Sequence, residues 1–150
     1  DWAQTGLAAP RKVRGWQRAG LKGRHGPLGP GGLEAALLLP MGRNGPAFLA
    51  YPNFKVLLEW NRSLTYVTTT AYFATRLEGA PPLDPRAPDP GLSGEEMRTL
   101  QRALAARGHD VGDVDGILGE KTRAAVRAEQ ARLGWPADAW PTPALVQALR

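Results

Sequence analysis

The stretch LQRALAARGHDVGDVDGILGEKTRAAVRAEQ, which occupies residues 100–130, decides the fold of the C-terminal part of this chain. Side chains at its start recur at spacings of three and four residues: Met97, Leu100, Gln101 and Leu104. This spacing places them on one face of a helix. Gly108 follows directly, and glycine easily adopts the left-handed conformation that ends a helix. The pattern therefore predicts a helix that ends near residue 107.

A tight connection and two further helices complete this part. The connection contains Asp113, Asp115, Gly116 and Gly119, and we expect Ile117 and Leu118 to lie under it and close the core. A second helix begins near Glu120 and should present one side formed by Thr122, Ala125, Val126 and Leu133. A third begins at Thr142 and Pro143 and should bury Leu145 and Leu149. The prediction is three short helices around a small core.

The glycine turns and the helix register together carry a specific resemblance. Leu-Gln at 100–101 is followed by Arg-Gly-His-Asp-Val-Gly at 107–112, Val-Asp-Gly-Ile-Leu-Gly at 114–119 and Lys-Thr-Arg-Ala-Ala-Val at 121–126. A second glutamine stands at position 130. Residues 92–149 thus resemble the three-helix peptidoglycan-binding domain of bacterial cell-wall enzymes. The resemblance implies a ligand groove along the glycine-rich loop and second helix, near Asp113, Asp115 and Arg123.

Two positions depart from this family's pattern. Glu129 stands where the family usually has a large aromatic residue, and Ala139 stands where it usually has glycine. A carboxylate on an inward face costs stability unless it reaches solvent or an arginine. We therefore expect this copy to be less stable than a typical member.

The composition excludes several classes of protein. The 150 residues contain no cysteine, so disulfides and zinc-thiolate sites are excluded, and no apolar run approaches the length of a membrane span. The chain starts at Asp1 without a leader, which indicates a processed product or the tail of a longer protein. Residues 1–83 carry ten Lys and Arg against four Asp and Glu. A basic segment suits nucleic acid, the anionic cell wall or simple solvation, and we favour solvation.

Residues 79–91, with five prolines, form the clearest boundary in the chain. Before it, residues 35–39 and 47–51 are apolar runs that predict two short strands. Apolar spacing then predicts two helices between residues 54 and 77, with a break at 61–63 and Ser63 as N-cap of the second. Residues 1–32 show no sustained periodicity, and Trp2 and Trp16 are expected to pack against a larger body.

The segment PAFLAYPNFKVLLEWNRSLTYV, at residues 46–67, carries a second resemblance. It is similar to the last part of the catalytic domain of lytic murein transglycosylases, in their membrane-bound B-type family. That family's aromatic-Asn-x-Ser-x-x-Tyr motif matches Trp60, Asn61, Ser63 and Tyr66. The resemblance implies that these residues hold an N-acetyl sugar, with Tyr51 and Asn53 in support. An amide pairs with N-acetyl groups, and an aromatic face stacks on a sugar ring.

The family's catalytic glutamate, in a Glu-Ser-x-x-Gly motif, has no counterpart here. The carboxylates before the boundary are Asp1, Glu34, Glu59 and Glu78, and none adjoins a serine. We therefore predict no catalytic residue and no cleavage by this chain alone. The resemblance implies that the whole protein cuts MurNAc-GlcNAc bonds to 1,6-anhydro products, with the glutamate and any membrane anchor in upstream sequence.

No metal or cofactor site is predicted. Asp110, Asp113 and Asp115 are spaced suggestively for calcium, but the closing glutamate of a calcium loop is not in place, so we interpret them as turn residues. His25 and His109 are isolated in the sequence and do not support a metal pair.

Together these patterns predict a mainly α chain. Residues 1–78 would be a partial lysozyme-like domain with two short strands, residues 79–91 a linker, and residues 92–150 the binding domain. The predicted function is peptidoglycan binding and turnover in the periplasm or cell envelope, by a monomer. The alternatives are a stand-alone non-catalytic wall-binding protein and, least favoured, a basic nucleic-acid binder.

Overall fold

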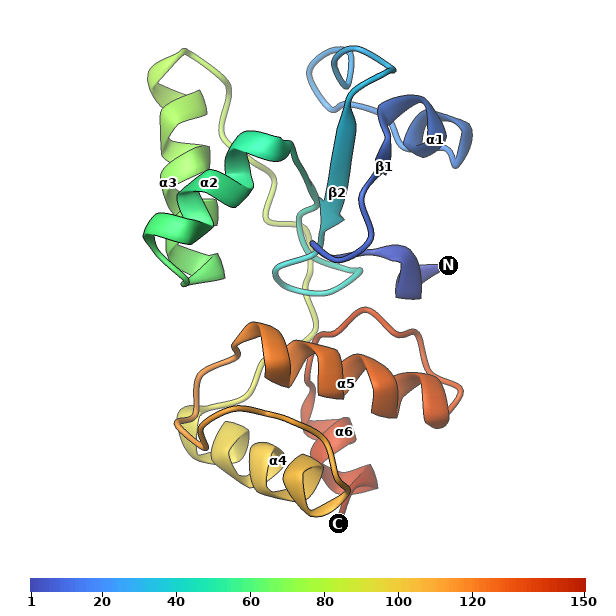
Figure 1. Cartoon of the computed structure of the whole chain (residues 1–150), viewed down its shortest axis with the longest axis vertical. Helices are drawn as coiled ribbons and strands as arrows, with labels where there is room; N and C mark the ends of the chain where they lie inside the picture. The colour runs from blue at the N-terminus through green and yellow to red at the C-terminus, as the bar shows by residue number, and fades with distance from the viewer. The chain divides into compact units, whose positions relative to one another are not determined.

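The computed structural model of the chain is mainly helical, with three short strands (Figure 1). It describes residues 1–150, except for the side chain of residue 3. No helix in the described part of the chain is long and apolar enough to cross a membrane. The elements, in chain order, are η1 (Trp2–Gln4), β1 (Arg11–Lys12), α1 (Val13–Arg18), β2 (Glu34–Leu38), β3 (Phe48–Ala50), α2 (Pro52–Trp60), α3 (Leu64–Leu77), α4 (Gly94–Ala106), α5 (Glu120–Arg132) and α6 (Pro143–Ala148).

The chain forms two compact units. One consists of Asp1–Ala3, Leu39–Pro46 and Leu83–Arg150, and we call it the α4–α6 unit. The other consists of Gln4–Leu38 and Ala47–Pro82, and we call it the sheet unit. The domain boundaries expected from the sequence, at residues 78/79 and 91/92, stay a prediction.

The three helices of the α4–α6 unit enclose one apolar core, as the spacing predicts. Leu100, Leu104 and Leu145 are fully buried in it, and Leu149 is nearly so. Ser93 and Glu96 start α4 with a reciprocal pair of hydrogen bonds between side chain and backbone. Gly108, at φ +88°, ends α4 as expected from the sequence. The helices therefore begin and end where their local sequence directs.

The connection between α4 and α5 departs from the prediction at one residue. Leu118 is half-buried and packs against the core, but Ile117 is 66% exposed. The expectation that both lie under the loop is therefore wrong for Ile117. Consecutive residues in an extended segment point to opposite sides, so only one of the two can face inward.

The sheet unit contains more structure than its sequence pattern predicts. The sheet has the order β1-β2-β3 with antiparallel pairs, so a third strand joins the two expected ones. Its residues, Arg11 and Lys12, lie in the region where the sequence indicated no periodicity, as does α1. A strand of two residues is too short to show an alternation of apolar and polar side chains. Its pairing partners, Glu34 and Ala35, are also distant in the sequence, so no local pattern predicts it.

The two tryptophans of residues 1–32 differ from each other. Trp16 is buried and donates its indole N–H to the Ala35 carbonyl oxygen at 2.8 Å, which fixes α1 against β2. Trp16 is thus packed within this chain, whereas Trp2 is 41% exposed here and its packing against a larger body stays a prediction.

The predicted helix pair follows β3. Figure 1 shows α2 and α3 side by side, in green, and residues 61–63 form the break between them. Phe54 and Val67 are buried beneath them with residues of the sheet. Several apolar side chains of these helices remain exposed: Val56, Trp60, Phe73 and Leu77. The pair therefore buries some of its apolar side chains within the sheet unit and leaves others exposed.

Candidate functional site

An exposed pair of aromatic rings marks the corner between α2 and α3. Trp60 is the last residue of α2 and is 77% exposed, and Tyr66 in the first turn of α3 is 47% exposed. Their ring centroids lie 6.2 Å apart with the planes inclined at 46°. This separation is within the range of favourable aromatic pairs. The corner therefore offers two adjoining ring faces to a ligand.

The turn between the two rings is held by short-range hydrogen bonds. The Ser63 backbone N–H donates to Oδ1 of Asn61 at 2.9 Å, and Ser63 Oγ accepts from the Tyr66 backbone N–H at 3.2 Å. Ser63 is therefore the predicted N-cap of α3. Because its oxygen is used by the turn, Asn61 has its NH₂ group to offer a ligand.

Tyr51 and Asn53 lie at the other end of α2. Tyr51 precedes the helix, and its hydroxyl donates to the Leu28 carbonyl oxygen, while Asn53 is exposed in the first turn. A helix of nine residues separates its ends by about 12 Å, at roughly 1.5 Å per residue. The structure thus places Trp60, Asn61 and Tyr66 together and sets the supporting pair apart from them. Glu59 is an exposed side chain of α2.

In the α4–α6 unit the two aspartates of the predicted groove lie on the α4–α5 loop. Gln101, fully buried, holds this loop by accepting from the Gly116 backbone N–H at 2.9 Å. Its NH₂ group lies 3.1 Å from Asp115 Oδ1 and 3.2 Å from the Asp113 carbonyl oxygen. Asp115 also accepts from the Ile117 backbone N–H at 2.8 Å, and these hydrogen bonds hold the pKa of its carboxyl below its ordinary value. Asp115 therefore shapes the loop.

Arg123, the third residue of that predicted groove, is engaged elsewhere. Its guanidinium donates to the Pro40 carbonyl oxygen at 2.8 Å and lies 6.0 Å from the ring centroid of Trp140. Burial and, to a lesser extent, the neighbouring Arg127 lower the pKa of Arg123 to about 10. The side chain remains charged at neutral pH. Among the described residues, Arg123 makes no hydrogen bond or ion pair with Asp113 or Asp115, and their shared role in a groove stays a prediction.

Glu129 faces inward, as its position in the pattern predicts, and it is paired. Its carboxylate lies 2.9 Å from Nε2 of His109 and 2.8 Å from Nε and Nη2 of Arg132. The hydrogen bond to His109, followed by that to Arg132, holds the pKa of Glu129 below its ordinary value. His109, which the sequence indicated to be isolated, therefore has a partner in the structure. Both partners offset the cost of the inward carboxylate that the sequence analysis expected to reduce stability.

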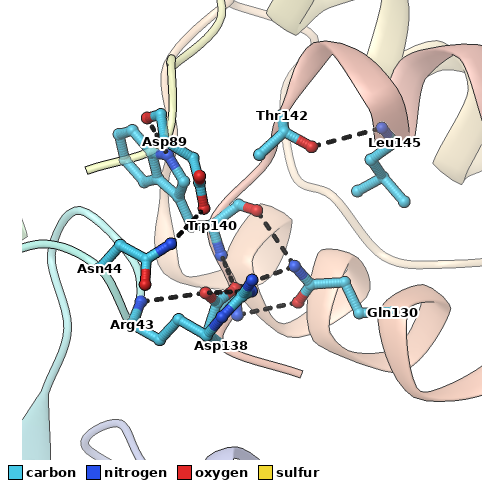
Figure 2. A network of polar contacts seen from close by, with 9 residues as sticks. Arg43, Asn44, Asp89, Gln130, Asp138, Trp140, Thr142 and Leu145 are labelled. Atoms are coloured by element: carbon cyan, nitrogen blue, oxygen red, sulfur yellow. Dashed lines mark hydrogen bonds and ion pairs between the residues drawn. The ribbon is translucent and has the colours of Figure 1, made fainter. Parts of the chain in front are cut away.

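A pocket that the sequence analysis did not predict lies on the loop between α5 and α6. It has a volume of about 420 Å³, and its walls include Arg43, Asp89, Trp135, Asp138, Trp140 and Pro143. Figure 2 shows Arg43, Gln130 and Trp140 turned toward the carboxylate of Asp138, one of the residues that line the pocket. The available signal was GWPADAWPTP at residues 134–143, which sets two tryptophans among prolines.

Comparisons with known proteins identify both parts of the chain. Residues 1–75 match the family model described as transglycosylase SLT domain, and residues 93–149 match the one described as putative peptidoglycan binding domain. No curated protein sequence matches the chain.

Two solved structures of SltB3 from Pseudomonas aeruginosa are similar over 100% of this chain. The one in complex with NAG-NAM-pentapeptide is 44% identical with a TM-score of 0.81, and the one with NAG-anhNAM-pentapeptide is 43% identical with a TM-score of 0.75. The chain spans 41% of the length of each. This chain therefore belongs to the transglycosylase SLT domain family, in its B-type lytic transglycosylase branch, and carries a peptidoglycan-binding domain after the transglycosylase segment.

Proposed function

We propose that this chain binds peptidoglycan in the bacterial cell envelope, as the C-terminal part of a lytic transglycosylase. The observation that carries the proposal is the succession, on one chain, of a transglycosylase segment and a peptidoglycan-binding segment. Both families act on the same polymer, so their adjacency favours a single substrate. In this proposal the transglycosylase domain segment is residues 1–78, the linker is residues 79–91 and the peptidoglycan-binding domain is residues 92–150.

In the transglycosylase segment, the exposed corner of Trp60, Asn61 and Tyr66 would form one wall of the glycan groove. Two adjoining ring faces suit the apolar faces of a sugar, and an amide N–H suits the carbonyl oxygen of an N-acetyl group. Ser63 supports the corner by capping α3, and Tyr51 and Asn53 would act at the far end of α2. Asp113, Asp115 and Arg123 remain the proposed contacts of the binding domain.

The chain would bind the wall without cutting it. Glycosidic cleavage needs a carboxyl group that donates a proton to the leaving oxygen. In residues 1–150 no glutamate is followed by serine, as the family's catalytic motif requires. The 1,6-anhydro product of the family would therefore come from the complete enzyme.

Co-sedimentation of the purified chain with insoluble peptidoglycan sacculi tests this proposal. We expect the chain in the pellet and no anhydro-muropeptides in the supernatant. Absence of binding would overturn the proposed function, and release of anhydro products would overturn the statement that this chain does not cleave.

A matched pair of variants tests the corner. Trp60→Ala should weaken binding of isolated glycan strands about tenfold, since a buried aromatic contact contributes roughly 1–2 kcal/mol. Phe73→Ala removes an aromatic ring of α3 that is 60% exposed and lies outside the proposed wall, so it should bind like the parent chain. Equal binding by both variants would contradict the assignment of Trp60.

A further inference from the structure

One loop of the segment that matches the transglycosylase SLT domain is built into the α4–α6 unit. Residues 39–46 lie between β2 and β3, inside the matched range of residues 1–75. This loop, which we call the strap, nevertheless belongs to the compact unit that contains α4, α5 and α6. The chain therefore leaves the sheet unit after Leu38 and returns to it at Ala47.

The centre of the strap is held by a buried carboxylate of the α5–α6 loop. Asp138 is 3% exposed, and its Oδ2 accepts from the Arg43 backbone N–H at 3.0 Å, with Nη1 of Arg43 at 3.6 Å (Figure 2). Its Oδ1 accepts from Gln130 Nε2 at 2.9 Å and from the Trp140 backbone N–H at 3.0 Å. A buried carboxylate is costly unless donors surround it. The strap therefore completes the set of donors around Asp138.

Two further hydrogen bonds hold the strap on either side of Arg43. The Arg123 guanidinium, on α5, donates to the Pro40 carbonyl oxygen at 2.8 Å. Nδ2 of Asn44 donates to Oδ2 of Asp89, at the end of the proline-rich segment, at 3.1 Å. The partners of the strap thus come from three separate stretches of the α4–α6 unit, so the strap leaves this unit only when several contacts break together.

The backbone of the strap approaches Trp140 more closely than a side chain would allow. Gly42 is buried with φ at +73°, and a Cβ there would lie 2.7 Å from Cβ of Trp140. The far edge of the same indole is close to the linker, because a Cβ at Gly91 would lie 3.0 Å from its Cζ2 atom. The indole N–H also donates to the Asp89 carbonyl oxygen at 3.0 Å. Trp140 therefore contacts both the strap and the end of the linker.

We propose that the strap joins the peptidoglycan-binding domain to the transglycosylase segment at a second point, besides the linker of residues 79–91. The linker keeps the strap near its partners at an effective concentration on the order of millimolar, so even a weak contact stays closed. The binding domain is then completed by residues of the transglycosylase segment and is not an autonomous module. This inference concerns contacts within the chain and does not depend on the polymer that the chain binds.

Cutting the linker of the full chain tests this proposal. The recognition sequence of a site-specific protease is inserted between Pro81 and Pro82, which are both exposed, and the purified chain is then cut. All the strap contacts described above connect residues on opposite sides of this cut. We expect the two pieces, residues 1–81 and 82–150, to elute together in size-exclusion chromatography, and dilution then gives their dissociation constant. Immediate separation of the pieces would overturn the proposal.

Variants assign the association to the strap, which is necessary because Asp1–Ala3 also belong to the α4–α6 unit. Asp138→Asn places an amide donor opposite the Arg43 N–H and should weaken association about tenfold or more, and Asn44→Ala should weaken it about threefold. The matched controls, Glu95→Gln on α4 and Gln147→Ala on α6, change exposed side chains and should leave association unchanged. If all four variants associate like the parent, the strap does not join the segments.

Amide exchange in the uncut parent chain gives a second readout, which does not require Asp138→Asn to fold. The Arg43 N–H, measured by NMR, should exchange about tenfold or more slowly than in an unstructured peptide, because Asp138 accepts it. Exchange at the unstructured rate would overturn the proposal. Neither outcome bears on wall binding: a chain with an open strap can still bind sacculi, and a chain that binds no sacculi can still keep the strap closed.

Discussion

The α4–α6 unit and the sheet unit differ in how completely they bury their apolar side chains. In the first, all three helices contribute to one core, and Leu100, Leu104 and Leu145 are fully buried. In the second, the buried cluster of α2, α3 and the strands is smaller, and Phe73 and Leu77 are at least 60% exposed. The difference shows that helix formation and helix burial are separate properties. A local pattern is sufficient for the helix, but burial requires a second surface.

The largest expected effect is a difference in hydrogen exchange between the two units. Backbone amides of α4 and α5 should exchange on the order of a hundredfold more slowly than those of α2 and α3, because an incomplete core opens more easily, by ~3 kcal/mol. Mass spectrometry of the full chain after timed exchange measures this. Equal protection of α3 and α4 would show that the sheet unit is as stable as the α4–α6 unit, and would contradict the difference in stability that we infer.

Removing the amide of Gln101 should destabilise the α4–α6 unit selectively. Gln101→Ala removes a fully buried amide and leaves the Gly116 N–H and the Asp113 carbonyl oxygen without their partner in a partly buried site, at a cost of about 2–3 kcal/mol. Chemical denaturation with segment-resolved hydrogen exchange should show the loss in α4 and none in α3. Gln147→Ala, on the exposed side of α6, is the matched control and should change nothing measurable.

A methyl group at residue 42 should cost about 2 kcal/mol. Gly42 has φ +73°, and a Cβ there would lie 2.7 Å from the Cβ of Trp140, so Gly42→Ala adds a clash to backbone strain. Gly134 has φ +70° with open space around it, so Gly134→Ala measures the strain alone, at about 1 kcal/mol. If urea denaturation gives the two variants equal stability, the contact with Trp140 contributes nothing.

Glycine at residue 139 should stabilise the α4–α6 unit by about 0.5–1 kcal/mol. Ala139→Gly relieves the left-handed strain of ~1–2 kcal/mol and loses ~0.5–1 kcal/mol through the greater freedom of glycine in the unfolded chain. The urea midpoint should rise. Ala105→Gly in α4, where the backbone is helical, should lower it by a similar amount. A fall for Ala139→Gly would mean that the methyl group packs more favourably than the strain costs.

The smallest effect concerns acid stability. Because the pKa of Glu129 is lowered in the folded chain, its pairing with His109 and Arg132 contributes stability above the ordinary glutamate pKa, and this is lost as pH falls through the lowered value. Glu129→Gln should therefore reduce stability at pH 7 and make the decrease between pH 5 and pH 3 shallower. Thermal unfolding across this range measures it, with Glu59→Gln as an exposed control. Parallel pH profiles for all three chains would contradict the pairing.

The elements that the sequence predicted correctly are those with local causes. Ser63 and Thr142 cap their helices, and Gly108 ends α4, because each acts on backbone groups within a few residues. The corner of Trp60, Asn61 and Tyr66 was also predictable, since all three lie at a single turn. Among the elements that the sequence did not predict, β1 is non-local, because its two residues pair with β2 from more than twenty positions away.

The sequence by itself determined the three-helix core, the α2–α3 pair and the family, because periodicity, caps and motif spacing are properties of neighbouring residues. Only the tertiary structure decided that His109 pairs with Glu129, that Ile117 faces outward and that Arg43 contacts Asp138, 95 positions away. These contacts depend on which surfaces meet after the helices have formed. No local sequence pattern specifies which surfaces come into contact, and the pocket beside α6 forms only because they do.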